Sequence, residues 1–208
     1  MKQKTYFITG ISTDVGKTVA SAIVTQALEA DYWKPVQAGD LHLSDTHKVQ
    51  HLVSNDISQY HDNAYALETP MSPHAAAAID GVTIKIKDIT RPSTKNNLVI
   101  EGAGGVLVPL NEQQTIADLI IPTDRVIVVS RHYLGSINHT LLTVKYLQQQ
   151  GVDHIAILFS GEAHPTTESI IKKMTSATIL GRIDQEPYVD ARVIEEYAER
   201  FRESLISL

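Results

Sequence analysis

Short apolar runs alternate along the chain with segments in which apolar residues recur every three or four positions. The apolar runs, each read as a buried strand, are Thr5–Thr9, Tyr32–Val36, Leu98–Ile100, Val126–Val129 and Ile155–Phe159. Strands that are apolar on both faces are typical of a parallel sheet covered by helices on each side. The alternation therefore predicts an α/β fold, with a doubly wound, mainly parallel sheet and helices on both faces.

Three segments carry the apolar stripes of helices that could cover this sheet. The stripes are Val19, Ile23, Ala27 and Leu28 in the first segment, Ile137, Leu141, Val144 and Leu147 in the second, and Val193, Tyr197, Phe201 and Leu205 in the third. Gly151 follows the second stripe, where glycine commonly ends a helix. Each stripe is expected to pack against the sheet.

The segment from residue 54 to residue 97 has a weaker pattern. Ala75–Ala78 favours a helix, and the alternation from Val82 to Ile86 indicates a short edge strand. Residues 89–97 have the composition of a loop. No repeat or linker divides the chain, so residues 1–208 are expected to form a single domain.

The composition and net charge exclude several classes of binding partner and chemistry. The net charge is −6 and no basic run is present, which makes nucleic acid and anionic membranes poor partners. There are no cysteines, which excludes disulfides, thiol nucleophiles and thiolate metal sites. Neither a signal peptide nor an apolar stretch of about 20 residues is visible. We therefore expect a cytoplasmic protein that binds small molecules.

The strongest motif is a glycine-rich loop between the first predicted strand and the first predicted helix. It reads Gly-Ile-Ser-Thr-Asp-Val-Gly-Lys-Thr from Gly10 to Thr18, with one residue more between the glycines than the usual G-x-x-x-x-G-K-[ST]. Such a loop turns backbone N–H groups toward phosphates, while Lys17 would reach the β- and γ-phosphates and Thr18 would ligate Mg²⁺. A glycine turn without a ligand is the alternative. We predict that ATP and Mg²⁺ bind here, at Asp14, Val15, Gly16, Lys17, Thr18 and Val19.

Two acidic residues could complete a metal site beside this loop. Glu101 ends the predicted strand Leu98–Ile100, and ligands of an open parallel sheet bind beyond the carboxyl ends of its strands. A carboxylate there could hold Mg²⁺, or it could be solvated and idle. Asp45 follows Ser44 at the start of a predicted helix, where the residues alone favour a helix cap.

In its glycine-rich loop and in the segments around Asp45 and Glu101, the chain resembles the dethiobiotin synthetases. Six blocks in the family's order carry the resemblance, which extends to about residue 185: Thr13–Thr18, Trp33–Gly39, Ser44–Asp45, Met71–His74, Glu101–Gly105 and Leu134–His139. The resemblance implies a P-loop NTPase-like fold and a carbon–nitrogen ligase of biotin biosynthesis. The reaction implied converts 7,8-diaminononanoate, CO₂ and ATP into dethiobiotin, ADP and phosphate, through a carbamate and a carbamic-phosphoric anhydride.

The resemblance also implies roles for individual residues. The catalytic residues implied are Lys34, Lys17 and Thr13, the Mg²⁺ ligands are Thr18, Asp45 and Glu101, and the residues near the diamine are Thr13, Asp14, Lys34, Ala38 and Gly104. From the residues alone, Lys34 could be only an edge cation, and Thr13 and Asp14 only turn formers. Ala38 stands where some family members have serine or threonine, and His74 could line the cleft or simply pack.

The resemblance further implies a homodimer with the substrate sites at its interface. In the family, the carboxylate tail of the substrate docks at the start of a helix from the partner subunit, an anion site of the helix-terminus kind. The matching positions are Leu134, Gly135, Ser136, Ile137 and Asn138. From the residues alone, Ser136 would be only a helix cap.

The adenine site departs from the family pattern. Ser160 follows the predicted strand that ends at Phe159, where many members carry an asparagine that recognises the adenine edge. A hydroxyl has fewer fixed donors and acceptors than an amide, so Ser160 predicts weaker selectivity among nucleoside triphosphates. Backbone groups near Gly181 are the other candidates for contacting the base.

Two alternatives share parts of this pattern. A related ATP-dependent amidoligase usually carries a glutamine amidotransferase domain with a nucleophilic cysteine, and the chain has no cysteine. A partitioning-type or septum-positioning nucleotide switch typically has a second lysine early in the phosphate loop, where this chain has Ile11 and Ser12. Both alternatives therefore fit less well than a dethiobiotin synthetase.

Overall fold

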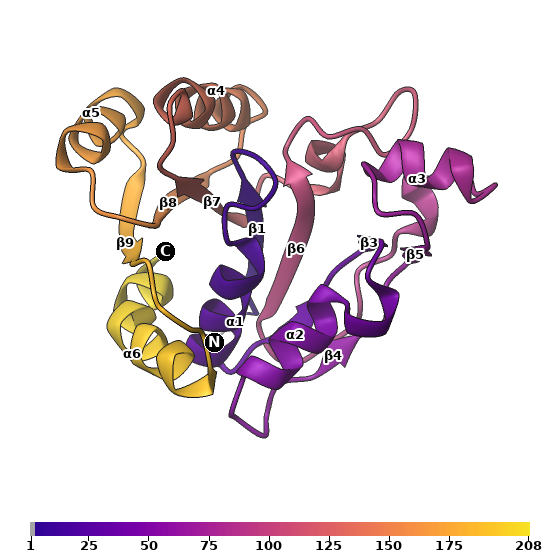
Figure 1. Cartoon of the computed structure of the whole chain (residues 1–208), viewed down its shortest axis with the longest axis horizontal. Coiled ribbons are helices and arrows are strands. Elements are labelled where there is room, and N and C mark those ends of the chain that lie inside the picture. The colour runs from indigo at the N-terminus through magenta and orange to yellow at the C-terminus, as the bar shows by residue number, and fades with distance from the viewer. Residues whose placement is uncertain (1–2) are drawn as a thin grey trace.

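The computed structural model describes residues 3–208, which are built around one seven-stranded sheet (Figure 1). The strand order is β4-β2-β6-β1-β7-β8-β9, and every neighbouring pair is parallel. The strands are β1 (Thr5–Gly10), β2 (Asp31–Trp33), β4 (Tyr60–His61), β6 (Leu98–Gly105), β7 (Arg125–Arg131), β8 (His154–Ser160) and β9 (Thr178–Ile183). The predicted parallel, doubly wound sheet is confirmed.

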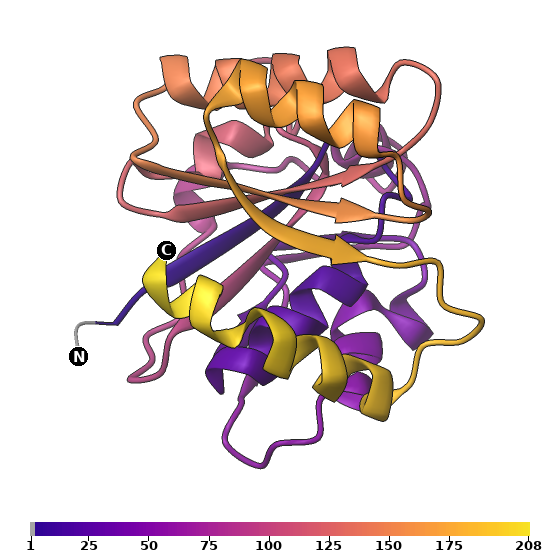
Figure 2. The same cartoon turned by 90° about the vertical axis from the view of Figure 1, so that its left-hand side faces the viewer.

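Helices cover both faces of the sheet (Figure 2). They are α1 (Lys17–Leu28), α2 (Asp45–Leu52), α3 (Pro73–Ile79), α4 (Ser136–Gln149), α5 (Pro165–Thr175) and α6 (Ala191–Ser207). α4 and α5 lie on one face, whereas α1, α2 and α6 lie on the other. Within residues 3–208, no helix is long and apolar enough to cross a membrane.

The core forms where the apolar runs of the central strands meet these helices. The side chains of Val126–Val129 in β7 and Ala156–Phe159 in β8 are almost completely buried. Tyr197 and Phe201 of α6 are buried as predicted, and Ile194 shares their face. These packed central strands give the loops at their carboxyl ends a rigid base.

The predicted second strand, Tyr32–Val36, is divided in two. β2 ends at Trp33, and β3 (Val36–Ala38) pairs in parallel with β5 (Tyr65–Leu67) as a separate two-stranded sheet. Pro35 lies at the break because proline has no N–H to donate to a sheet. The break leaves Lys34 just beyond the carboxyl end of β2.

The predicted edge strand from Val82 to Ile86 is wrong. No described strand pairs with this segment; its backbone bonds instead to side chains and to nearby backbone groups, such as the Ala77 carbonyl, which accepts from the Val82 N–H. The Lys85 N–H donates to the Tyr65 hydroxyl, and the Ile84 carbonyl accepts from Asn111. The alternation arises because Ile84 is buried in the core while the side chains beside it face solvent. The helix expected at residues 75–78 is confirmed as part of α3.

The buried face of α4 differs from the predicted one. Val144 and Leu147 are buried as expected, but Thr140 and Thr143 share their face and Ile137 is 37% exposed. The Thr140 hydroxyl bonds to the carbonyl one turn earlier, so burying it leaves no polar group unpaired. Ile137 therefore faces away from the sheet.

Candidate functional site

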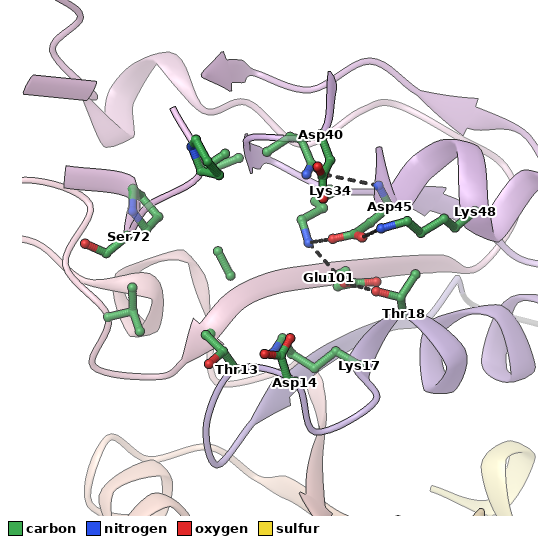
Figure 3. A pocket seen from close by; sticks show the side chains of 18 of the residues that line it. Thr13, Asp14, Lys17, Thr18, Lys34, Asp40, Asp45, Lys48, Ser72 and Glu101 are labelled. Carbon is green, nitrogen blue, oxygen red and sulfur yellow. Dashed lines mark hydrogen bonds and ion pairs between the residues drawn. The ribbon is translucent and has the colours of Figure 1, made fainter. Parts of the chain in front are cut away.

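A cavity of about 900 Å³ opens at the carboxyl ends of β1, β2 and β6 (Figure 3). Its walls come from the glycine-rich loop, the starts of α1 and α2, the β2–β3 connection and the residues just before α3. The predicted site residues that line it are Thr13, Asp14, Gly16, Lys17, Thr18, Val19, Lys34, Ala38, Asp45, Glu101 and Gly104. Residues from four separate parts of the sequence are thus brought into one site.

The glycine-rich loop is shaped by two residues with positive φ. Asp14 has φ 53° and Gly16 has φ 93°. A Cβ on Gly10 would lie 2.7 Å from the Ser12 carbonyl oxygen, so a larger residue would clash there. The loop wraps the start of α1, whose unpaired N–H groups and positive dipole end suit an anion.

Lys17 is the first residue of α1, and it is only 8% exposed. Its Nζ donates to the Ser12 carbonyl, 3.1 Å away, so the ammonium folds back over the loop. Burial lowers the pKa of Lys17, and the charge of Glu101 opposes this shift. An ammonium has three donors, which leaves Lys17 able to donate to phosphate oxygens in the cavity.

Lys34, Asp45 and Glu101 form an ion-pair cluster on the opposite wall (Figure 3). Lys34 Nζ contacts Asp45 Oδ2 and lies 3.0 Å from Glu101 Oε1. Thr18 Oγ1 donates to the same Glu101 oxygen over 3.1 Å, and the Tyr32 hydroxyl donates to Oε2 over 3.0 Å. The three predicted Mg²⁺ ligands therefore converge, with the Lys34 ammonium between the two carboxylates.

Glu101 lies inside β6 rather than at its end. The predicted strand is too short because β6 continues to Gly105, which pairs with Gly10 after a local shift in register. Glu101 is 1% exposed, so it is neither solvated nor without partners. A buried carboxylate held by a hydroxyl, a phenol and an ammonium is typical of a functional site.

Opposite charges control ionisation in this cluster. Burial alone would lower the pKa of Lys34, but Glu101 and Asp45 outweigh it and raise that pKa. Burial would raise the pKa of Asp45, but the ammonium of Lys34, with that of Lys48, lowers it. Burial, and then the charge of Glu101, raise the pKa of Tyr32 well above its usual value, so its hydroxyl stays a donor.

Two residues of the site escaped the sequence reasoning. Lys48 lines the cavity and lies 3.3 Å from Asp45 Oδ1, one helical turn away. Tyr32 was read only as part of an apolar strand. The cap expected at the Ser-Asp pair is confirmed for Ser44, whose side chain accepts from the His47 N–H. Asp45 is thereby free to face Lys34.

Three predicted nucleotide-binding residues lie outside the cavity lining. Val15 is buried in the core, whereas Ser160 flanks the loop, since a Cβ on Gly16 would lie 3.2 Å from Ser160 Oγ. Gly181 lies within β9, where a Cβ would be 2.7 Å from the Phe201 ring. That glycine therefore has a packing role. Contacts of Ser160 and Gly181 with a base, and of Val15 with the nucleotide, stay predictions.

The segment Leu134–Asn138 also lies outside the cavity, between β7 and the first turn of α4. The cap considered at Ser136 is wrong, because Gly135, with φ 104°, holds the cap position and Ser136 is the first helical residue. Leu134 is fully exposed, and Tyr133 and Ile137 are exposed beside it. None of these three apolar residues lines the cavity.

Comparisons with known proteins agree with the site. A family model described as an AAA domain matches residues 4–193. A relative from Christiangramia forsetii, named ATP-dependent dethiobiotin synthetase BioD, is 62% identical over 205 residues and covers 99% of each chain. A relative of the same name from Cytophaga hutchinsonii is 49% identical over 197 residues, which are 94% of this chain and 95% of that one.

A solved structure of a ParA family ATPase from Chlorobium tepidum has the same fold, with a TM-score of 0.61 and 10% identity over 99% of this chain and 100% of that one. At this identity the likeness shows the fold alone, and it does not favour a partitioning function. The full-length relatives are dethiobiotin synthetases by name, and the site agrees with them, because the loop, the lysine and the carboxylates line one cavity. The chain belongs to the AAA domain family and, within it, to the dethiobiotin synthetases.

Proposed function

We propose that this chain is an ATP- and Mg²⁺-dependent ligase that closes the ureido ring of dethiobiotin from 7,8-diaminononanoate, CO₂ and ATP. One observation carries the proposal: Lys17 and the loop face the Lys34–Asp45–Glu101 cluster across a single cavity. A triphosphate gripped by the loop would present its γ-phosphate to that cluster. The full-length relatives named dethiobiotin synthetase support the choice of substrates.

The reaction needs three bond-forming steps. One amine of the substrate adds to CO₂ and loses a proton, which gives a carbamate. A carbamate oxygen attacks the γ-phosphorus, and the bond to the ADP oxygen breaks. The second amine then attacks the carbonyl carbon of this mixed anhydride and loses a proton, phosphate leaves with the bonding electron pair, and the ring closes. Each step gathers negative charge in a small volume, so charge neutralisation and placement limit the rate.

The cavity supplies cations on two sides of that charge. Lys17, buried beside the loop, would donate to the β- and γ-phosphate oxygens. Lys34, on the opposite wall, would stabilise the carbamate and the transferring phosphoryl group. Thr13, Asp14, Ala38 and Gly104 would lie along the diamine, where the Asp14 carboxylate could attract an ammonium.

The oxygen atoms around Lys34 fit a magnesium ion. Thr18, Asp45 and Glu101 offer a hydroxyl and two carboxylates, the hard oxygen donors that Mg²⁺ prefers. The two carboxylates already contact one cation, the Lys34 ammonium, and the Thr18 hydroxyl bonds to Glu101. These three residues would hold the ion. When bound, Mg²⁺ would neutralise charge on the phosphates.

The substrate tail would be bound across a homodimer interface at Leu134–Asn138. The exposed surface of Tyr133, Leu134 and Ile137 supports this, because apolar side chains on a protein surface often mark an interface. Leu134→Asp is expected to shift the chain to monomer in analytical ultracentrifugation and to raise the KM for the diamine at least about tenfold. Ile206→Asp, equally apolar and 50% exposed on α6, is the control. A dimer that survives Leu134→Asp would refute this interface.

Phosphate release from ATP, Mg²⁺ and bicarbonate tests the function directly. The diamino acid should stimulate release strongly, and mass spectrometry should find dethiobiotin in proportion to phosphate. An equal rate of phosphate release with and without the diamino acid would exclude the proposed ligase. We further propose a cytoplasmic location and a single domain.

Ser160 leads to a prediction about nucleotide choice. Its hydroxyl flanks the phosphate loop, where it cannot offer the paired donor and acceptor of an amide. GTP and CTP are therefore expected to support ring closure within about tenfold of ATP, and Ser160→Asn is expected to sharpen the preference for ATP. The measurement is kcat/KM for each nucleotide. A strong ATP preference in the unaltered chain would contradict the prediction.

A further inference from the structure

Lys48 is a second cation on the proposed metal ligand Asp45. Its Nζ lies 3.3 Å from Asp45 Oδ1, while Lys34 contacts the other oxygen, Oδ2. Lys48 follows Asp45 by three positions on α2, so the two side chains share one helix face. The Lys48 side chain lines the cavity and is 39% exposed (Figure 3).

The two carboxylates of the cluster, Asp45 and Glu101, have different hydrogen-bond partners besides Lys34. Glu101 would keep Thr18 and Tyr32 as donors if Lys34 moved away, at 3.1 Å and 3.0 Å. Of the described side chains that bond its carboxylate, Asp45 would keep only Lys48. In the proposed reaction Lys34 must turn to the carbamate and the phosphoryl group, which leaves Asp45 to its remaining partner.

We propose that Lys48 is a positioning residue that keeps the Asp45 carboxylate aimed at the metal when Lys34 is engaged with substrate. This inference rests on the proposed function of the cavity. Lys48 would act on Asp45 as Tyr32 acts on Glu101. Partners of this kind fix the orientation of a metal ligand, and their loss typically weakens metal binding about 10- to 100-fold.

A purely electrostatic role would have the opposite sign. An ammonium beside a metal ligand repels the metal, so its removal should tighten metal binding if charge were its only contribution. If Lys48 orients Asp45, its removal should weaken binding instead. The direction of the change therefore separates the two roles.

The test measures binding of Mn²⁺, a spectroscopic stand-in for Mg²⁺, in the presence of ADP by electron paramagnetic resonance. We expect Lys48→Met to weaken Mn²⁺ binding roughly tenfold, the low end of the range because the side chain is partly exposed. Lys48→Arg, which retains a cation, should restore most of the affinity. Lys172→Met, an exposed lysine on α5, should leave it unchanged.

Equal or tighter Mn²⁺ binding by Lys48→Met would overturn the positioning role. If the unaltered chain bound no Mn²⁺ with ADP, the proposed function would fail and this inference with it. Thermal unfolding of each variant shows whether the fold persists. Because Lys48 is partly exposed and makes one ion pair, Lys48→Met is expected to unfold within a few degrees of the unaltered chain.

Discussion

Lys17→Ala is expected to lower kcat/KM for ATP by about a thousandfold or more while leaving the protein folded. Among the described lysines that line the cavity, Lys17 alone comes from the loop side, because Lys34 and Lys48 pair with Asp45 on the opposite wall. Removing one preorganised donor to a developing charge typically costs about 10²–10³ in rate, and Lys17 also contributes to binding the triphosphate. The measurement is dethiobiotin formation over a range of ATP concentrations.

The free energy of unfolding of Lys17→Ala provides the control, because it shows whether the variant is still folded. The ammonium makes one bond, to the Ser12 carbonyl, and its pKa is lowered by burial, so its charged form gains little from the fold. Lys17→Ala should therefore change the free energy of unfolding by no more than about 1.5 kcal/mol. A variant that stays folded and retains full ring-closing activity would place the triphosphate somewhere other than this loop.

The phosphate loop was predictable because its chemistry is local. Its turn, its glycines and its lysine lie within nine consecutive residues, and the apolar strand before it and the helix after it are visible as patterns. Glu101 was found for a similar reason, because strand ends of a parallel sheet meet at one edge. The strand itself was drawn too short, since glycines such as Gly105 weaken a strand pattern without ending the strand.

The rest of the site depends on contacts between distant segments. The residues around Asp45 alone favoured a helix cap, and only the family resemblance made Asp45 a metal-ligand candidate. The fold places it against Lys34, which lies beside the break at Pro35. The role of Tyr32 could not be predicted, because a tyrosine in an apolar run gives no sign of where its hydroxyl points. Lys48 is the exception. It follows Asp45 by three positions on a helix, so contact between the two side chains could have been predicted once Asp45 was a ligand candidate.

Lys34→Met is expected to lower kcat by about a thousandfold with little change in the KM for ATP. Lys34 is already paired with Asp45 and Glu101 before substrate binds, so its gain on turning to the carbamate and phosphoryl group belongs mainly to the transition state. The same change should destabilise the metal-free protein. Breaking a buried ion pair from one side costs about 3–5 kcal/mol, and the lower figure applies here because Asp45 is 19% exposed.

Added Mg²⁺ should reverse part of that destabilisation, because the dication would replace the lost ammonium between the two carboxylates. Urea unfolding of Lys34→Met with and without Mg²⁺ measures this, and Lys172→Met, which changes an exposed lysine on α5, is the control. Two results would contradict the assignment. A higher KM with unchanged kcat would make Lys34 only a binding group, and stability that ignores Mg²⁺ would mean that Asp45 and Glu101 do not form the metal site.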